Sequence, residues 1–486
     1  MVGQVYIYDL SFLVLFVLVV SLFLYKHRAR AKWEGVMLLY RTQVGIKFID
    51  YVNDHFGKYI SKLKWVIITT GYISMVVMSF LLLQLLYVFI RFPEVVQRVK
   101  IPPIAPLIPY LPELFKVDFL PPFYFTYWIL AIAVIALSHE FAHGIFAKIN
   151  RVRVKSTGFG FLGPFLAAFV EPDEEQMAKI KKSDQLAILG AGSFANILMT
   201  ILFLCILWIF FLASFSPAGF TFNTYAFSVV NISSIEQLGG IPITSPGQIS
   251  GILALPAENR TGKQVNGHNF TEAVVGTERY YVENELIEYH MKHNFTQTYV
   301  YENSPALASG LQGVIVEVDG KKVRDQDDLK NILSQKNPGE TTPLTTSLEG
   351  KLFHYTVRLG RNPLTGKGYL GVATINGGSG TVTSKIRNLA IFFRKPSTYY
   401  APRYNPELIT FIYDLLGWIV LINISVALMN MLPVGIFDGG RVFYLTLWAI
   451  FKTEKAAKRG YKIATHVILW IFILLTAAWV WHTFFP

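Results

Sequence analysis

The sequence predicts a polytopic α-helical membrane protein of about six spans and a half-helix, with an α+β domain inserted between its membrane segments. Three observations support this fold class. The 486-residue chain is 52% hydrophobic and only 16% charged, a balance far from that of ordinary soluble enzymes. Several apolar runs reach the ~20 residues that cross a bilayer. A long polar stretch rich in Gly, Pro, Thr and Asn separates the fourth run from the fifth.

Each predicted span is an apolar run with few charges. The six runs lie at about 6–25, 65–91, 123–149, 185–213, 407–432 and 463–485. The first has no basic leader and no small-residue cleavage site, so we expect a retained anchor rather than a signal peptide. The apolar stretch Val442–Phe451 is too short to span and is predicted to be a half-helix.

Basic residues gather beside the spans and predict the orientation of the chain. The clusters lie in Lys26–Lys64, Lys148–Lys155 and Lys452–Lys462, and the positive-inside rule places all three in the cytoplasm. The net charge of +12 then indicates contact with anionic lipids of the bilayer rather than with nucleic acid. The segment 26–64 also alternates apolar and basic residues, which is typical of an amphipathic helix on the membrane surface.

This orientation places residues 214–406 outside the membrane. Four Asn-x-Ser/Thr sequons agree, because such sequons mark surface sites on exported chain, although short sequons also arise by chance. They begin at Asn231, Asn259, Asn269 and Asn294. The only cysteine, Cys205, lies in an apolar span, so no intramolecular disulfide is possible.

The third apolar run contains the sequence His139-Glu140-Phe-Ala-His143. Ionisable groups at membrane depth are costly and are usually functional. On a helix the two histidines are one turn apart and share a face, so their imidazoles can bind Zn²⁺ while Glu140 lies beside the open position. His139 is nine residues before Lys148, about 14 Å from the cytoplasmic end. The motif therefore predicts a zinc hydrolase with a submerged active site.

A zinc site needs a third protein ligand, with water completing the tetrahedron. The fifth span ends in Asn430-Met-Leu-Pro433, followed by Asp438-Gly439-Gly440. Pro433 cannot continue the helix, and the paired glycines permit a sharp turn. Irregular backbone at this depth must line a wet cavity or be buried in protein. Asp438 is thus the predicted third ligand; the alternative is an Asp that caps the following half-helix.

Together the two motifs resemble those of the site-2 protease family of intramembrane zinc metalloproteases. The resemblance covers about 123–213 and 405–451, and the segment Gly192–Asn196 is similar to the family's Gly-rich Asn motif, with Ser193 near the point where the family usually has Pro. It implies catalysis by Glu140 and zinc binding by His139, His143 and Asp438.

Further site residues follow from the same resemblance. Asn430 matches a residue suspected of supporting the oxyanion or the substrate, with an interhelical hydrogen bond as the alternative, and Asn196 is expected to pack or to support the site. The stretch 154–171 resembles a membrane-dipping β segment. A strand there with Gly158, Gly160 and Gly163 is predicted to pair with an unwound substrate; the alternative is a loop that covers the site.

The inserted segment resembles a PDZ domain at about 299–375. A strand at Val314–Gly320, a helix at Asp327–Leu333 and a hairpin around Glu349-Gly350 carry this resemblance. Such a domain binds a peptide, filters substrates by size or serves as a spacer. Residues 219–298 either add strands to it or form a separate lobe.

The chain is thus divided into five parts. They are 1–122, with spans 1 and 2, the basic segment 26–64 and an outer loop 92–122; 123–213, the first half of the catalytic core; 214–406, the extracytoplasmic insertion; 407–451, the second half of the core; and 452–486, a basic loop and the last span.

The predicted function is intramembrane cleavage of single-span proteins of the cell membrane, after an earlier cut elsewhere (regulated intramembrane proteolysis). Three alternatives remain. The first is a PDZ-bearing scaffold or receptor with an inert zinc site. The second is a transporter with broken helices, and the third is a membrane zinc protease with a cytosolic chamber.

Overall fold

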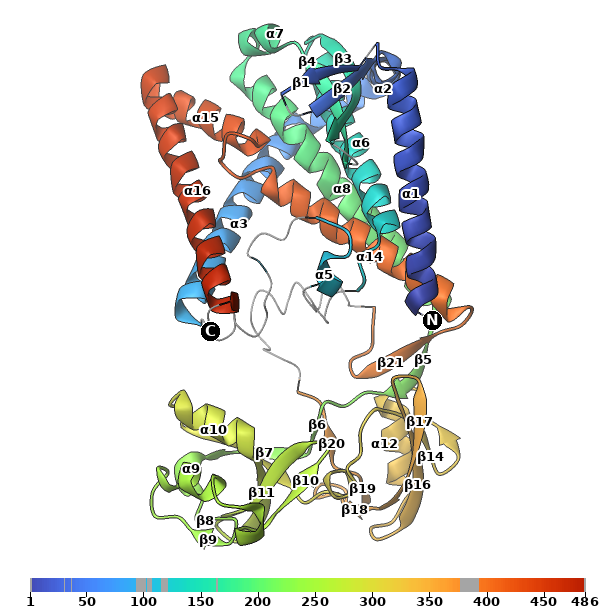
Figure 1. Cartoon of the computed structure of the whole chain (residues 1–486), viewed down its shortest axis with the longest axis vertical. Helices are drawn as coiled ribbons and strands as arrows, with labels where there is room; N and C mark the ends of the chain where they lie inside the picture. The colour runs from blue at the N-terminus through green and yellow to red at the C-terminus, as the bar shows by residue number, and fades with distance from the viewer. Residues whose placement is uncertain are drawn as a thin grey trace. The chain divides into compact units, whose positions relative to one another are not determined.

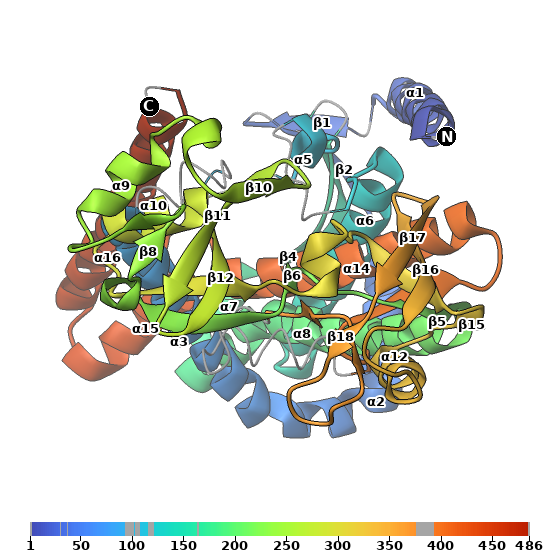
Figure 2. The same cartoon turned by 90° about the horizontal axis from the view of Figure 1, so that it is seen from below.

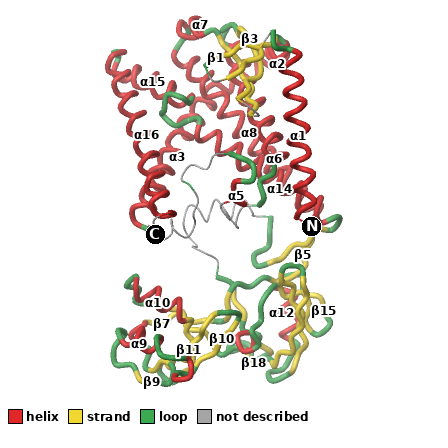
Figure 3. Tube along the Cα trace, in the orientation of Figure 1, coloured by secondary structure: helices red, strands yellow, loops and turns green. Residues whose placement is uncertain are grey.

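The structure is a computed structural model of the whole chain. It describes residues 2–29, 31–35, 37–92, 102, 107–114, 121–162, 165–375 and 393–484. The chain forms two compact units, Met1–Phe211 with Glu407–Pro486, and Leu212–Pro406. Helices make up most of the first unit, whereas the second unit has more strand than helix, joined by many loops (Figure 3).

Six helices in the described part of the chain are long and apolar enough to cross a membrane, as the sequence predicts. All lie in the first unit, apart from the last residues of α8 and the first residue of α14 (Figure 1). They are α1 (Val2–Lys26), α3 (Lys64–Arg91), α6 (Phe125–Ile149), α8 (Lys182–Ser214), α14 (Pro406–Met429) and α16 (Glu454–Phe484).

The first span is tied to the N-terminus of α6 by a buried carboxylate. Asp9 of α1 is only 4% exposed. It accepts hydrogen bonds from the backbone N–H groups of Phe125 and Thr126 at 2.8 and 2.9 Å, and from the hydroxyls of Thr126 and Tyr110 at 2.5 Å each. The first N–H groups of a helix have no partner within the helix. Asp9 therefore caps α6 from another segment of the chain.

The basic segment 26–64 differs in part from its predicted amphipathic helix. Its second half is α2 (Val44–Ile60), which continues through the 3₁₀ turn Ser61–Leu63 into α3. Its first half is instead a hairpin of β1 (Ala31–Glu34) and β2 (Met37–Thr42). The hairpin forms because β2 has a partner far along the chain, a contact that local periodicity cannot reveal.

That partner belongs to a four-stranded antiparallel sheet with the order β1-β2-β3-β4, where β3 is Val154–Leu162 and β4 is Phe165–Pro172. The prediction that Gly158 and Gly160 pair with a substrate is therefore wrong. Both lie on β3, which is flanked by β2 and β4, so their backbone groups are already paired within the sheet. A Cβ on Gly158 would lie 2.1 Å from the carbonyl oxygen of Tyr40, so the glycine lets β2 approach. The third glycine of that prediction, Gly163, is outside the described residues.

The helix break at the end of α14 forms as predicted, and the half-helix α15 begins earlier, at Asp438 (Asp438–Phe451). The paired glycines serve close packing rather than a sharp turn. A Cβ on Gly439 would lie 2.2 Å from the Met431 backbone, and one on Gly440 would lie 2.2 Å from the Val434 carbonyl oxygen. The first turn of α15 therefore packs directly on the connecting loop, which fixes the position of Asp438.

The second unit contains two larger sheets, which are seen from below in Figure 2. One has the order β17-β16-β14-β5-β21 and packs its core against α12 (Gln326–Ser334). The predicted helix and hairpin are confirmed here. The strands are β5 (Phe215–Phe220), β14 (Val314–Val318), β15 (Lys321–Lys322), β16 (Thr341–Leu348), β17 (Lys351–Arg358) and β21 (Thr398–Pro402).

The other sheet has the order β7-β13-β12-β11-β8-β9 and packs on α9 (Gln248–Leu253) and α10 (Asn284–Lys292). Residues 219–298 thus supply most of a separate sheet. Its strand β13 (Gln297–Glu302) begins the stretch predicted to be PDZ-like, so the lower bound near 299 is wrong. The other strands are β7 (Phe227–Asn231), β8 (Gln237–Leu238), β9 (Ile241–Pro242), β10 (Gly262–Val265), β11 (His268–Val275) and β12 (Glu278–Glu283).

Candidate metal centre

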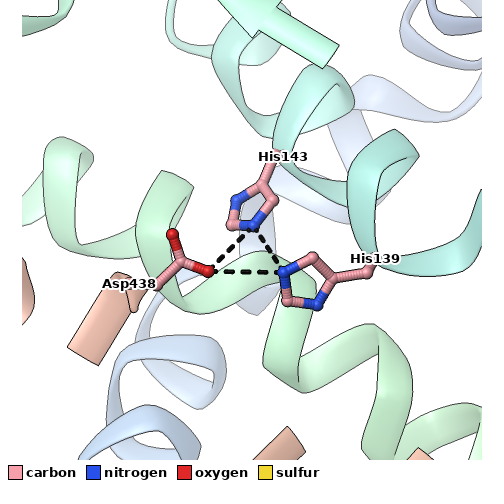
Figure 4. A group of neighbouring side chains, drawn as sticks. All are labelled: His139, His143 and Asp438. Atoms are coloured by element: carbon pink, nitrogen blue, oxygen red, sulfur yellow. Dashed lines mark hydrogen bonds and ion pairs between the residues drawn. The ribbon is translucent and has the colours of Figure 1, made fainter. Parts of the chain in front are cut away.

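The two histidines of the motif project from one face of α6 (Figure 4). Their Nε2 atoms are 3.0 Å apart. His139 is buried and His143 is half-buried, so other protein atoms cover most of both imidazoles. The spacing of four residues in a helix produces this arrangement, because it places side chains one above the other on the same face.

Asp438 joins them from the first turn of α15. One oxygen, Oδ2, lies 3.3 Å from Nε2 of His139 and 3.2 Å from Nε2 of His143. The structure thus brings together the three predicted metal ligands, although Asp438 is almost three hundred residues further along the chain. Figure 4 shows the carboxylate and both imidazoles converging on one point.

The donor set and its spacing fit a zinc ion. Two atoms bound at 2.0–2.2 Å to a tetrahedral ion lie about 3.3 Å from each other. The three separations of 3.0, 3.3 and 3.2 Å match that value. Two imidazoles and one carboxylate form a ligand set of catalytic zinc sites and leave the fourth position open.

Each histidine has a partner for its other ring nitrogen. Nδ1 of His143 lies 2.7 Å from the carbonyl oxygen of Ile188, which accepts its proton. Nδ1 of His139 lies 3.2 Å from the carboxamide of the fully buried Asn196. The carboxamide nitrogen Nδ2 faces this ring, while Oδ1 accepts a hydrogen bond of 3.2 Å from the Ser138 hydroxyl. The Ile188 carbonyl keeps the proton of His143 on Nδ1 and leaves its Nε2 free for a metal, while Asn196 helps to orient the ring of His139.

The structure also gives contacts for two further predicted site residues, Asn430 and Glu140. Nδ2 of Asn430 lies 3.4 Å from Nε2 of His139, so this side chain reaches the ligand cluster itself. Glu140 is half-buried, and its Oε2 accepts a hydrogen bond of 2.9 Å from the backbone N–H of Val170 on β4. Both predicted supporting asparagines therefore contact His139.

Three contacts of the site were missed by the sequence reasoning. They are the Ile188 carbonyl, the Val170 N–H and the close approach of Gly192, whose Cβ would lie within 2.6 Å of Nε2 of both histidines. Only Gly192 carries a signal in the sequence, since a glycine inside an apolar helix costs about 1 kcal/mol relative to alanine and marks close packing. Backbone donors and acceptors have no signature at all.

Comparisons with known proteins agree with this geometry. The family model of peptidase family M50, the site-2 protease family, matches residues 127–316 and 401–475, more than half of the chain. The uncharacterized protein MJ0971 of Methanocaldococcus jannaschii is 31% identical over 173 residues, which are 34% of this chain and 42% of that protein. The chain thus spans less than half the length of this relative. Because the family match covers both the histidine motif and Asp438, the chain belongs to peptidase family M50, a family of metalloproteases.

Proposed function

We propose that this protein is an intramembrane zinc metalloprotease that cleaves the transmembrane segments of membrane-anchored proteins. One observation carries the proposal: His139, His143 and Asp438 place three ligand atoms within 4.8 Å of one another, with the histidines inside a candidate membrane span and Asp438 at the start of α15. Membership of peptidase family M50 supplies the reaction class.

The orientation follows from charge. The basic clusters beside α3, α6 and α16 place those ends of the helices in the cytoplasm by the positive-inside rule. The active site then lies in the cytoplasmic half of the membrane, and the unit Leu212–Pro406 lies outside. The asparagines of its four sequons, Asn231, Asn259, Asn269 and Asn294, are all exposed, as glycosylation requires.

The chemistry assigns a separate role to each side chain. Bound zinc supplies a Lewis acid that polarises the scissile carbonyl and lowers the pKa of water. Glu140 takes the proton of the attacking water and delivers it to the departing amine. The Nδ2 group of Asn430 donates a hydrogen bond to the charge that develops on the scissile carbonyl oxygen.

A transmembrane helix must unwind before its peptide bonds can react, because its carbonyl groups are already hydrogen-bonded. The edge strand β4 offers an unwound segment new partners by strand addition. In this proposal β4, rather than Gly158 and Gly160 on β3, pairs with the unwound substrate. The substrates are single-span proteins, already trimmed outside the membrane.

The inserted unit favours substrates with small outer portions. The sheet that packs on α12 and contains the hairpin β16–β17 resembles a PDZ module. We propose that this module binds a peptide or acts as a size filter. The test uses one single-span substrate made with a short and with a long outer portion, and the protease with and without its own residues 221–396. If the module is a size filter, the deletion should restore cleavage of the long substrate.

Glu140→Gln tests the enzyme against a scaffold with an inert site. Quantitative proteomics of membranes with the parent or the variant protein should show single-span fragments that accumulate only with the variant. Both proteins should retain one zinc ion per chain, since Glu140 is not a ligand. Identical fragment patterns with zinc retained would favour the scaffold and overturn the proposal.

A further inference from the structure

The free edge of β4 leads to the general base. Val170 donates its N–H to Glu140, while β3 lies on the opposite side of β4. The register between the two strands is regular from Val170 back to Phe165. Successive residues of an antiparallel strand alternate between facing the partner strand and facing away. The N–H and C=O groups of Leu166 and Ala168 therefore point to the same side as the N–H of Val170.

These two residues offer an open pairing edge. Leu166 and Ala168 are half-buried, and their outward N–H groups have no bonded partner within the described residues. At Val170 the situation differs, because the Glu140 carboxylate occupies the place that the carbonyl of an added strand would take. The backbone positions of β4 that can pair with a substrate therefore end at Ala168, because the next outward N–H, that of Val170, is bonded to Glu140.

We infer that the Val170 N–H positions Glu140 and ends the pairing edge, so that a substrate paired with Leu166 and Ala168 presents its next peptide bond to Glu140. The inference rests on the proposed function and adds a rule to it. Backbone register along β4, rather than a pocket for one side chain, selects the scissile bond. Val170 acts through Glu140 and is a positioning residue.

Removing single backbone N–H groups tests this inference. An ester bond in place of the Val170 amide, introduced as the matching α-hydroxy acid, removes the N–H and keeps the side chain. Val170→Pro removes it genetically, since proline is tolerated on an edge strand whose N–H faces away from its neighbour. Val170→Ala measures the contribution of the side chain. Ala168→Pro removes the neighbouring outward N–H.

The substrate is the single-span fragment that accumulates most in Glu140→Gln membranes, purified in detergent. Loss of a hydrogen bond to a charged group should lower kcat of the ester variant about ten- to a hundredfold with KM little changed. Val170→Pro should fall well below Val170→Ala. Ala168→Pro should mainly raise KM and spread cleavage over neighbouring bonds. Zinc content is measured for every variant.

Several results would overturn the inference. A zinc-bound ester variant with the parent's kcat would show that the N–H does not position Glu140. Equal losses in Val170→Pro and Val170→Ala would assign the effect to side-chain packing. An Ala168→Pro protein with the parent's KM and cleavage site would exclude pairing at that edge. If the parent itself cleaves nothing, the proposed function fails and this inference falls with it.

Hydrogen exchange gives a readout that does not depend on turnover. The Val170 amide should exchange slowly in the parent protein and faster in Glu140→Ala, which removes its acceptor. The Ala168 amide should exchange fast in the inactive Glu140→Gln protein and become protected when the fragment is added. An Ala168 amide that stays unprotected with the fragment bound would contradict strand addition.

Discussion

Gly192 of α8 and His143 of α6 lie so close that a Cβ on the glycine would be 2.4 Å from Nε2 of the imidazole. Contacts of Cβ atoms below 3.0 Å are essentially never seen, so either the imidazole or the helix would have to move. The same Cβ would lie 2.6 Å from Nε2 of His139. The lack of a side chain at position 192 therefore makes room for both imidazoles of the candidate metal centre.

Gly192→Ala should lower zinc affinity by about ten- to a hundredfold, the usual cost of disturbing groups around a metal's ligands. The measurement is zinc retained after dialysis against graded chelator concentrations. Gly417→Ala is the matched control, because its Cβ position in α14 has no neighbour within 4 Å apart from its own stretch of helix. Similar zinc retention in both variants would show that the histidines adapt to an added methyl group.

Asp438→Ala should remove zinc binding, because it deletes one of three protein ligands and leaves two imidazoles without the anionic donor. Zinc per chain and cleavage of the accumulated fragment should be lost together. Glu174→Ala provides the control, since this exposed carboxylate pairs with Arg441 at 3.2 Å and exposed ion pairs contribute little. An Asp438→Ala protein that binds zinc as tightly as the parent and still cleaves would refute the ligand assignment.

Asn196→Ala should weaken zinc binding by about tenfold or more, since Nδ1 of His139 loses the partner that orients the ring. Asn423→Ala is a stringent control. That side chain is also fully buried in a span, but it donates to the Ile419 carbonyl of its own helix at 2.8 Å. Its loss should alter thermal stability alone. Equal zinc affinities in the two variants would limit Asn196 to packing.

Asp9→Ala should destabilise the membrane unit, because it leaves the N-terminal N–H groups of α6 without their acceptor. Removing a helix N-cap costs about 0.5–2 kcal/mol, and here the same carboxylate also binds two hydroxyls. Thermal unfolding in detergent measures the loss. Asp54→Ala on the exposed face of α2 should unfold like the parent. Unchanged unfolding of Asp9→Ala would mean that the other contacts of α1 are sufficient to hold it.

Much of the fold was predictable because it is local. A span is recognised from about 20 consecutive apolar residues, and all six predicted spans correspond to apolar helices of sufficient length. The pairing of His139 with His143 follows from helical periodicity. The position of Asp438 is predictable from the break at Pro433 together with the charges that set the depth of each span end.

The errors concern contacts between distant segments. Gly158 and Gly160 were assigned to a free edge because nothing near them reveals that β2 pairs with β3. The PDZ-like stretch was extended over β13 for the same reason, since its partners β7 and β12 precede it in the chain.

By itself the sequence determined the membrane character of this protein, the types of its candidate metal ligands and the place of Glu140 beside them, because hydropathy and helical spacing are properties of neighbouring residues. Only the tertiary structure decided that Gly192 lies against His143, that Asp9 caps α6 and that Val170 holds Glu140. Each of these contacts joins segments that meet only across the fold. Which backbone N–H finds an acceptor, and where a side chain would clash, depend on how these segments pack together, and local composition does not reveal that packing.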